Sequence, residues 1–336
     1  MKFLKSISTV ALALTLLLSA GCSANQPAVK SNLFAGSHWL KSTEVGGVGQ
    51  VDETCVYDIT FKANTPTENS ETTEFLSASD FSGTLTTKLT KASYNEQECY
   101  KFTTEMSVTG TYHYKDQSAI ITDYACSEVY FLGLTSSLAP LYSKKYTCNT
   151  SPLISSILNT AQFITMEYTV ESVYDLTEKT ATVTLIGGDK STEGYKYSES
   201  QKVYENYAKS GSFFDNESLL FIPRAADFAE GGFSQAFYTI DAPAEKIHKM
   251  LLSVNSNAPT SEVELEKFIS GGIEHSQKFP VYNATISISN TFSGSDIDLY
   301  YATDVANHQR RLIKMETQLP YTCGTLVYTL KEVSYK

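Results

Sequence analysis

The sequence predicts a mainly β protein, built from antiparallel barrel or sandwich domains with two short helices in the C-terminal half. Three observations lead to this prediction. Tyrosine is abundant, with 22 among 336 residues, and tyrosine favours pleated, half-buried surfaces. Apolar and polar residues alternate in several short runs, for example over residues 55–61. Gly, Pro and Asn separate these runs, as is typical of turns between strands.

The N-terminal stretch has the layout of an export signal. Lys2 and Lys5 precede an apolar run over residues 10–18, and the small residues 19–21 lead to Cys22. The basic end is expected to stay on the cytoplasmic side. The apolar run is too short to span a bilayer, which takes about 20 residues. We therefore expect a cleaved signal peptide and no permanent membrane helix here.

This arrangement resembles the precursor of a bacterial lipoprotein, whose signal peptide ends in a lipobox. The resemblance implies cleavage after residues 1–21, a diacylglyceryl thioether on Cys22 and an acylated amino group, although Ser19 stands where leucine is commonest. Several acyl chains anchor firmly, because each buried CH₂ contributes about 0.8 kcal/mol. Ser23 suggests, by resemblance to Gram-negative lipoproteins, delivery to the outer membrane. The alternative is an ordinary signal peptide cut near Ala24.

The mature chain is long, acidic and poor in charged residues. Cleavage leaves 315 residues, which suggests two domains. The removed segment carries two lysines, so the net charge changes from −11 to −13. Such a chain does not follow a phosphate backbone by charge, so we expect no nucleic-acid partner. No second run of 18 apolar residues follows Cys22, so the lipid is the expected contact with the membrane.

We expect four parts after the signal peptide. Residues 22–33 are polar and form a lipidated tether, and residues 34–132 form an N-terminal β domain. Gly and Pro punctuate residues 133–160, which we assign to a linker region. Residues 161–336 form a C-terminal β-rich domain.

The N-terminal domain contains several β-prone runs. Gly110 interrupts one of them in the sequence pattern. The runs cover residues 55–61, 84–90, 100–108, 112–114, 119–121 and 129–131.

Part of this domain is similar to small bacterial lipocalin-like (calycin) domains. These open with a Gly-x-Trp strand and later carry a Gly-Thr-Tyr strand. Here Gly36-Ser37-His38-Trp39 has one residue too many, and Thr109-Gly110-Thr111-Tyr112 follows before Ile120-Ile121. Over residues 34–132 the resemblance implies an antiparallel barrel closed over a ligand cavity. Any β-sandwich with a buried tryptophan is the alternative.

The C-terminal half reads as strands interrupted by two helices. Ile247, Met250, Leu251 and Val254 have helical spacing and predict a helix near residues 243–254. A capping box, Ser261-x-x-Glu264, predicts a second helix near residues 262–270, ended by Gly271-Gly272. The expected strands cover residues 164–170, 181–185, 218–222, 235–240, 282–288, 297–301, 311–315 and 325–333.

The cysteines suggest disulfides, because an exported compartment permits them. Besides Cys22 the chain has five, and pairing nearest in sequence gives Cys55–Cys99 and Cys126–Cys148 with Cys323 left over. A Cys148–Cys323 bridge is an open alternative. Cys55 falls on the apolar face of its run and Cys99 on the polar face, which opposes the first pairing unless a bulge intervenes.

Few residues suggest chemistry. The five histidines are scattered singly, and His248 is expected on the solvated side of its helix. Asp296 and Asp298 share a strand face and are a weak candidate for a Ca²⁺ site. The alternative interpretation is that both carboxylates lie on a solvated strand face beside a turn. A candidate recognition surface for a glycan or a partner protein consists of Tyr195, Tyr197, Tyr204 and Tyr207. The alternative interpretation is that these tyrosines are half-buried on a β surface.

No catalytic constellation is visible. The chain lacks a Gly-x-Ser-x-Gly elbow, a His-Glu-x-x-His motif, a phosphate loop and a dinucleotide fingerprint, so we expect no cofactor and no enzyme activity. The leading hypothesis is a lipid-anchored protein of the cell envelope with a non-enzymatic binding or scaffolding role. The alternatives are a lipocalin-like carrier of a small apolar ligand and an envelope hydrolase with an unrecognised site. The expected partners are the membrane through the anchor and an envelope protein, a glycan or a small apolar ligand.

Overall fold

The computed structural model describes most of the chain after the N-terminal segment. The described residues are 18–19, 52–64, 76–133, 138–155, 160–191, 197–207, 212–225, 233–254, 261–288, 294–295, 297–303 and 310–335. Several residues of the sequence-based predictions lie outside these ranges: the predicted lipidation residue Cys22, the predicted tether, Trp39, Tyr195 and Asp296.

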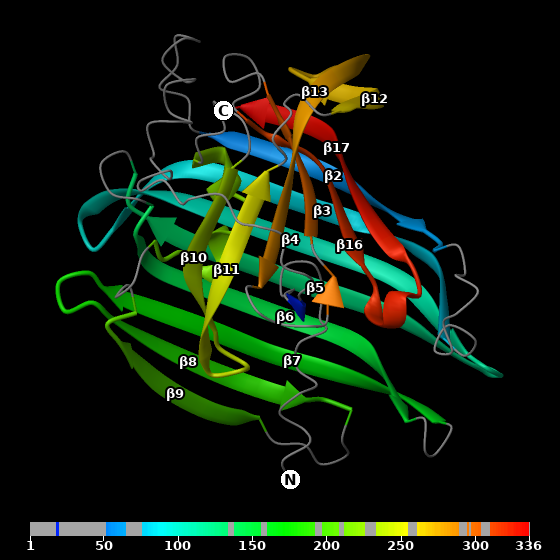
Figure 1. The fold of residues 1–336 in the computed structure, drawn as a ribbon, viewed down its shortest axis with the longest axis horizontal. Coiled ribbons are helices and arrows are strands. Elements are labelled where there is room, and N and C mark those ends of the chain that lie inside the picture. The colour runs from blue at the N-terminus through cyan, green and yellow to red at the C-terminus, as the bar shows by residue number, and fades with distance from the viewer. Residues whose placement is uncertain are drawn as a thin grey trace.

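A single large sheet contains nearly all the described strands (Figure 1). Its strand order is β10-β11-β13-β15-β16-β17-β2-β3-β4-β5-β6-β7-β8-β9, with β12 paired to β13 and β17. The strands are β2 (Glu53–Lys62), β3 (Leu76–Tyr94), β4 (Gln97–Tyr114), β5 (Gln117–Phe131), β6 (Pro140–Ser155), β7 (Thr160–Asp175), β8 (Thr180–Asp189), β9 (Ser198–Glu205), β10 (Phe233–Asp241), β11 (Lys246–Val254), β12 (Ser261–Ser270), β13 (Ile273–Ile288), β15 (Ile297–Ala302), β16 (Leu312–Gln318) and β17 (Thr325–Tyr335). A separate two-stranded pair joins β1 (Leu18–Ser19) to β14 (Gly294–Ser295).

A closed barrel of five strands lies in the C-terminal half. β13, β15, β16 and β17 follow one another as antiparallel neighbours. β12 closes the ring, because it pairs antiparallel with β13 and parallel with β17. The mainly β class and the presence of a barrel are therefore confirmed.

The barrel is not where the lipocalin-like resemblance places it. Within residues 34–132, the described strands β2 to β5 are four successive members of the large sheet. They do not close on themselves, because β2 pairs with β17 and β5 pairs with β6. Residues 140–155, expected in a linker region, form β6 between β5 and β7, so the sheet is continuous there. β4 also runs through Gly110 without a break.

The helix predicted near residues 243–254 is wrong, since this segment contains β11. Met250 and Leu252 are fully buried and Val254 is 7% exposed, so every second residue faces the core. Ile247, which completes the helical spacing, is exposed. Branched Ile and Val side chains fit a pleated surface better than a helix, and a partner strand on each side decides the outcome.

The second predicted helix, near residues 262–270, is β12. Leu265 and Phe268 are three residues apart, as on one face of a helix, yet both are buried in a strand. The pairing of β12 with β13 shifts register between these two residues, so the irregularity brings both side chains to the same face. Gly271 and Gly272 have positive φ angles of 59° and 78° and form the hairpin turn to β13. In the described residues, the remaining regular structure consists of the short 3-10 turns η2 (Asn216–Ser218), η3 (Ile222–Ala225) and η4 (Pro320–Thr322).

The inner face of the sheet carries one main apolar core. This core draws buried residues from β2 to β5, from the turn region 214–225 and from the barrel strands. Phe221 is fully buried there, with its ring 5.6 Å from Phe102 and 5.1 Å from Phe131. A smaller cluster lies under β7 to β9 and includes Tyr174, Tyr204 and Phe213.

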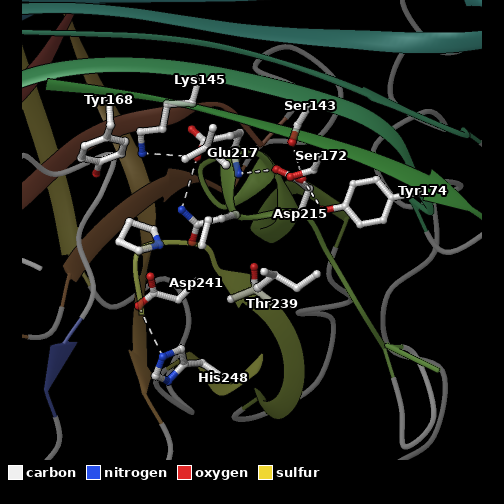
Figure 2. A pocket seen from close by; sticks show the side chains of 15 residues that line it. Ser143, Lys145, Tyr168, Ser172, Tyr174, Asp215, Glu217, Thr239, Asp241 and His248 are labelled. Carbon is white, nitrogen blue, oxygen red and sulfur yellow. Dashed lines mark hydrogen bonds and ion pairs between the residues drawn. The ribbon is translucent and has the colours of Figure 1, made fainter. Parts of the chain in front are cut away.

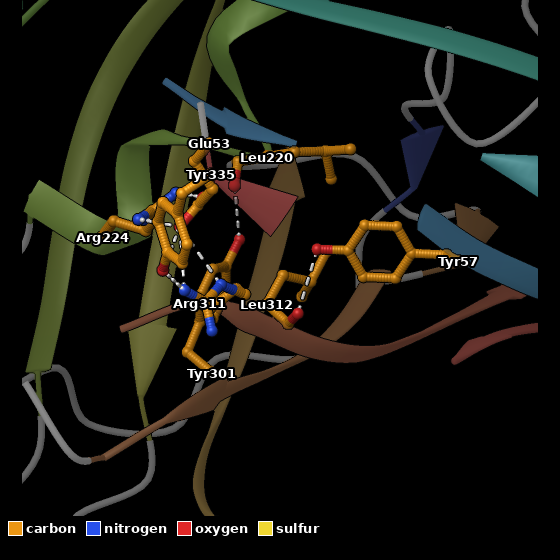
Figure 3. Close-up of polar contacts among 8 residues, drawn as sticks. All are labelled: Glu53, Tyr57, Leu220, Arg224, Tyr301, Arg311, Leu312 and Tyr335. Atoms are coloured by element: carbon orange, nitrogen blue, oxygen red, sulfur yellow. Dashed lines mark hydrogen bonds and ion pairs between the residues drawn. The ribbon is translucent and has the colours of Figure 1, made fainter. Parts of the chain in front are cut away.

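A buried carboxylate joins three distant parts of the chain (Figure 3). Glu53, the first residue of β2, is 3% exposed and accepts hydrogen bonds from Arg224 Nη1 at 2.7 Å and Arg311 Nη2 at 3.0 Å. Arg224 belongs to η3 and Arg311 directly precedes β16. Arg311 also donates to the hydroxyl of Tyr335, the last residue of β17. We call Glu53, Arg224 and Arg311 the arginine clasp.

Candidate polar pocket

The inner face of the sheet changes from apolar to polar at β6. Five side chains at alternate positions of β6 are buried although all are polar: Ser143, Lys145, Thr147, Asn149 and Ser151. Buried polar groups cost free energy unless they are hydrogen-bonded. The hydrogen-bond partners of these side chains therefore show which groups of the region are satisfied and which are not. Opposite this strand lie η2 and the β10–β11 hairpin, and Phe214 N, two residues before η2, donates to Tyr238 O of β10.

Asp215 organises the turn η2 and is fully supplied with donors. It caps the turn by accepting from Glu217 N at 2.7 Å. Its other oxygen accepts from Ser143 Oγ at 2.6 Å and from Tyr174 OH at 2.5 Å. Burial raises the pKa of Asp215, and the donated hydrogen bonds and the Lys145 charge offset this only in part. Asp215 therefore holds β6, β7 and η2 together and is committed to the fold.

Glu217 is different, because only one of its oxygens has a partner. Glu217 Oε1 lies 3.2 Å from Lys145 Nζ, and both side chains are less than 10% exposed. The same oxygen accepts from Asn216 Nδ2 at 3.4 Å. Glu217 Oε2 is buried and has no hydrogen-bond partner. Burial raises the pKa of Glu217 despite the neighbouring Lys145.

The hairpin of β10 and β11 supplies the facing wall. Thr239 pairs with His248 across the hairpin, and His248 Nε2 lies 3.4 Å from Asp241 Oδ2. Asp241 Oδ1 accepts from Ala244 N at 3.1 Å. Thr239 is 1% exposed, and its hydroxyl has no hydrogen-bond partner.

These side chains surround a cavity of about 50 Å³ (Figure 2). Its polar wall contains Lys145, Asp215, Glu217, Asp241 and His248, and apolar side chains such as Val170 and Ile240 complete it. One water needs a space of at least about 10–15 Å³, so the cavity holds a few water-sized groups. We call it the polar pocket.

The sequence did not indicate this pocket. His248 was expected on the solvated side of a helix, yet it is partly buried at the pocket wall. The signal that could have revealed the site is the polar residue at every second position of residues 143–151. The other walls come from segments up to a hundred residues away, which no local pattern brings together.

The cysteine pairs expected from the sequence are not bonded, and all five described cysteines are free. Cys55 and Cys99 lie opposite Thr87 and Ala92 of β3, five residues apart, so their side chains leave opposite faces of the sheet. Cys126 and Cys148 lie on neighbouring strands in diagonal positions. Diagonal neighbours in a sheet are about 7–8 Å apart and their Cβ atoms somewhat less, whereas the two Cβ atoms of a disulfide are about 3.8 Å apart.

The predicted tyrosine surface is not a single surface. Tyr204 and Tyr207 are buried in the smaller core cluster at 7% and 6% exposure. Tyr197 is exposed and donates to Glu167 Oε2 at 2.6 Å. Asp298, of the weak metal pair, is half-buried on β15 and accepts from Thr285 Oγ1 at 3.4 Å.

The described ranges contain no helix that is both long and apolar enough to cross a membrane. Over the same ranges, no group of three or more His, Cys, Asp or Glu side chains is placed to hold a metal ion.

Comparisons with known proteins give little for this chain. No protein-family model matches it, and no curated protein matches it. A solved structure described as a β-barrel-like protein of domain of unknown function DUF1849 from Brucella abortus matches 85% of this chain and 98% of its own. Its sequence identity is 9% and the TM-score is 0.46. At this level the similarity carries no conclusion about family or function.

Proposed function

We propose that the protein is a lipid-anchored protein of the cell envelope that binds a small polar ligand in the polar pocket without transforming it. The anchor is supported by the sequence alone, through the lipobox that ends at Cys22. With residues 1–21 removed, the acidic body would have a net charge of −13 and no electrostatic attraction to an anionic membrane, so the acyl chains would provide the attachment.

The observation that carries the binding role is the pair of buried oxygens without partners. Glu217 Oε2 and Thr239 Oγ1 both belong to residues that line the polar pocket. A buried polar atom without a partner costs about 1–3 kcal/mol. A bound ligand that hydrogen-bonds to either atom would recover part of this free energy. The charged walls favour such a ligand over the small apolar molecule of a lipocalin-like carrier.

The arrangement of the acids supports binding more than chemistry. Asp215 accepts hydrogen bonds from three donors, and the hydroxyl of Ser143 is one of them. Lys145 is paired with Glu217. These groups are therefore engaged in holding the pocket, and they fix the position of the remaining Glu217 oxygen.

The anchor is tested by mass spectrometry of the protein purified from membranes. We expect a mature N-terminus at Cys22 that carries the mass of the acyl groups, and we expect Cys22→Ser to release the protein from the membrane fraction. A mature N-terminus beyond residue 22 without an acyl mass would show that the anchor is absent.

The binding role is tested by thermal unfolding of the full-length protein in a neutral detergent with three small probes. Ethylammonium chloride, sodium acetate and glycerol represent cationic, anionic and neutral polar ligands, and potassium chloride at equal ionic strength gives the baseline. Binding to the folded state alone raises the unfolding temperature in a saturable way. We expect at least one probe to do so. The binding role is wrong if none of the three raises the unfolding temperature above the baseline.

A further inference from the structure

We infer that the polar pocket binds the primary ammonium group of a short-chain amine. This inference rests on the binding role proposed above and specifies the ligand class. Three features of the polar pocket lead to it: the charge of its wall, the hydrogen-bond acceptors that lack a donor, and the volume of the cavity.

The pocket wall has an excess of negative charge. Its carboxylates are Asp215, Glu217 and Asp241, and its lysine is Lys145. With His248 neutral and the acids ionised, the formal charge is −2. Burial raises the pKa of Asp215 and of Glu217, and the charge of Lys145 offsets this only in part. At Glu217 the charge of Asp215 raises the pKa further. A cation placed beside Glu217 would favour its ionised form.

A ligand that satisfies the unpaired atoms of the pocket must donate hydrogen bonds to them. A carboxylate oxygen such as Glu217 Oε2 only accepts, and a threonine hydroxyl can accept as well. Hydrogen bonds from a charged donor to a carboxylate are among the strongest in proteins. An ammonium group has three donors, so it can donate to Glu217 Oε2 and still has donors for a further acceptor of the pocket wall, among which Thr239 Oγ1 has no partner.

Other cations fit the pocket less well. A guanidinium group prefers to bind both oxygens of one carboxylate, but Glu217 Oε1 already faces Lys145 at 3.2 Å. The described residues also place no metal-binding group of three ligands here. A cavity of about 50 Å³ accepts an ammonium head with a short alkyl stem, and Val170 and Ile240 provide apolar contact for that stem.

The inference is tested by calorimetric titration of ethylammonium chloride into the full-length protein in a neutral detergent. We expect saturable binding by the wild type, with potassium chloride giving only a heat of dilution. Thr239→Val keeps the shape and the Lys145–Glu217 pair but removes the hydroxyl. Glu217→Gln removes the charge of the carboxylate. Each variant should weaken ethylammonium binding at least tenfold.

Two controls make the variants interpretable. Glu171→Gln removes the same charge on the half-buried outer side of β7, where Glu171 accepts from Tyr142 OH at 2.8 Å, and it should bind ethylammonium like the wild type. Thermal unfolding of each variant without ligand shows whether it is folded. If Glu217→Gln does not fold, Thr239→Val alone decides the result.

The possible results distinguish a failure of the ammonium assignment from a failure of the proposed binding role. Binding of ethylammonium that Thr239→Val weakens supports both. Binding of acetate or glycerol without ethylammonium overturns the ammonium assignment but keeps the binding role. Ethylammonium binding that Thr239→Val leaves unchanged also overturns the assignment, because the ligand then lies elsewhere. If no probe binds, both are wrong.

Discussion

Replacing Glu53 by glutamine is expected to destabilise the protein by about 3–5 kcal/mol, because it leaves buried arginines without their counter-ion. Arg224 and Arg311 are 4% and 3% exposed, and both donate to the Glu53 carboxylate. The glutamine side chain keeps one acceptor oxygen, but in place of the second oxygen it puts an amide NH₂ group, a donor, beside the donating guanidinium groups of the two arginines. Chemical denaturation of the wild type and of Glu53→Gln measures the difference.

A matched control is available on the same strand. Asp58 of β2 forms an ion pair with Lys331 at 3.1 Å, but both side chains are nearly half exposed. Exposed pairs contribute about 0–1 kcal/mol, so Asp58→Asn should change the stability little. An equal loss of stability in the two variants would mean that the arginine clasp has no special role.

The clasp also predicts how stability depends on acid. Burial alone would raise the pKa of Glu53, but the charges of Arg224 and Arg311 outweigh it and hold the pKa at about 2. The lowered pKa means that the carboxylate stabilises the fold above the ordinary glutamate pKa of about 4.3. This contribution, about 3 kcal/mol, is lost as the pH falls toward 2. Glu53→Gln should lack that part of the acid dependence.

The second large effect is expected at Asp123, where Asp123→Asn should stabilise the protein at pH 8 by up to about 4 kcal/mol. Asp123 is 4% exposed on the inner face of β5. Burial raises its pKa to about 7, and the hydrogen bond from Thr150 N at 2.7 Å offsets this only in part. The folded protein therefore keeps a proton that the unfolded chain releases near pH 4.

The sign of the pH dependence follows from this proton. Between about pH 4 and pH 7 the folded state binds more protons than the unfolded state, so stability falls as the pH rises. Asp123→Asn removes this fall, because an amide does not titrate. The amide also offers a donor on a face where Asn149 Oδ1 of β6 is buried without a partner.

Denaturant titrations at pH 5 and pH 8 measure the effect at Asp123. The control is Asp116→Asn in the exposed turn between β4 and β5, which should leave the pH dependence unchanged. If Asp123→Asn is no more stable than the wild type at pH 8, then the Asp123 carboxyl is ionised in the folded state at little cost.

The sequence could locate those strands that have one apolar face. The alternation over residues 55–61 lies inside β2, that over residues 164–170 lies inside β7, and residues 325–333 lie inside β17. In β2 and β17 the period of two reports burial on one side of a sheet, whereas in residues 164–170 of β7 only Tyr168 is buried. β6 could not be recognised in this way, because its inner face is polar from Ser143 to Ser151 and so does not differ in polarity from its outer face.

The two false helices have a related cause. Spacings of three and four occur in strands when a register shift or a partly exposed residue breaks the alternation, as between Leu265 and Phe268. The closure of the barrel and the polar pocket could not be predicted for a different reason. Both depend on pairing between segments far apart in the chain, for example Glu217 with Lys145, and local patterns contain no information on such pairs.

The pairing of β2 with β17 has a consequence for how the protein is made. The two strands pair in antiparallel register from Lys62 opposite Thr325 to Glu53 opposite Tyr335. During synthesis β2 emerges early and β17 emerges last, so the hydrogen-bonding edge of β2 stays open while more than 250 residues are still to come. Open edges invite pairing with other chains, and contacts this distant form slowly. The edge of β2 therefore stays exposed to such pairing until the final eleven-residue strand is made and pairs with it.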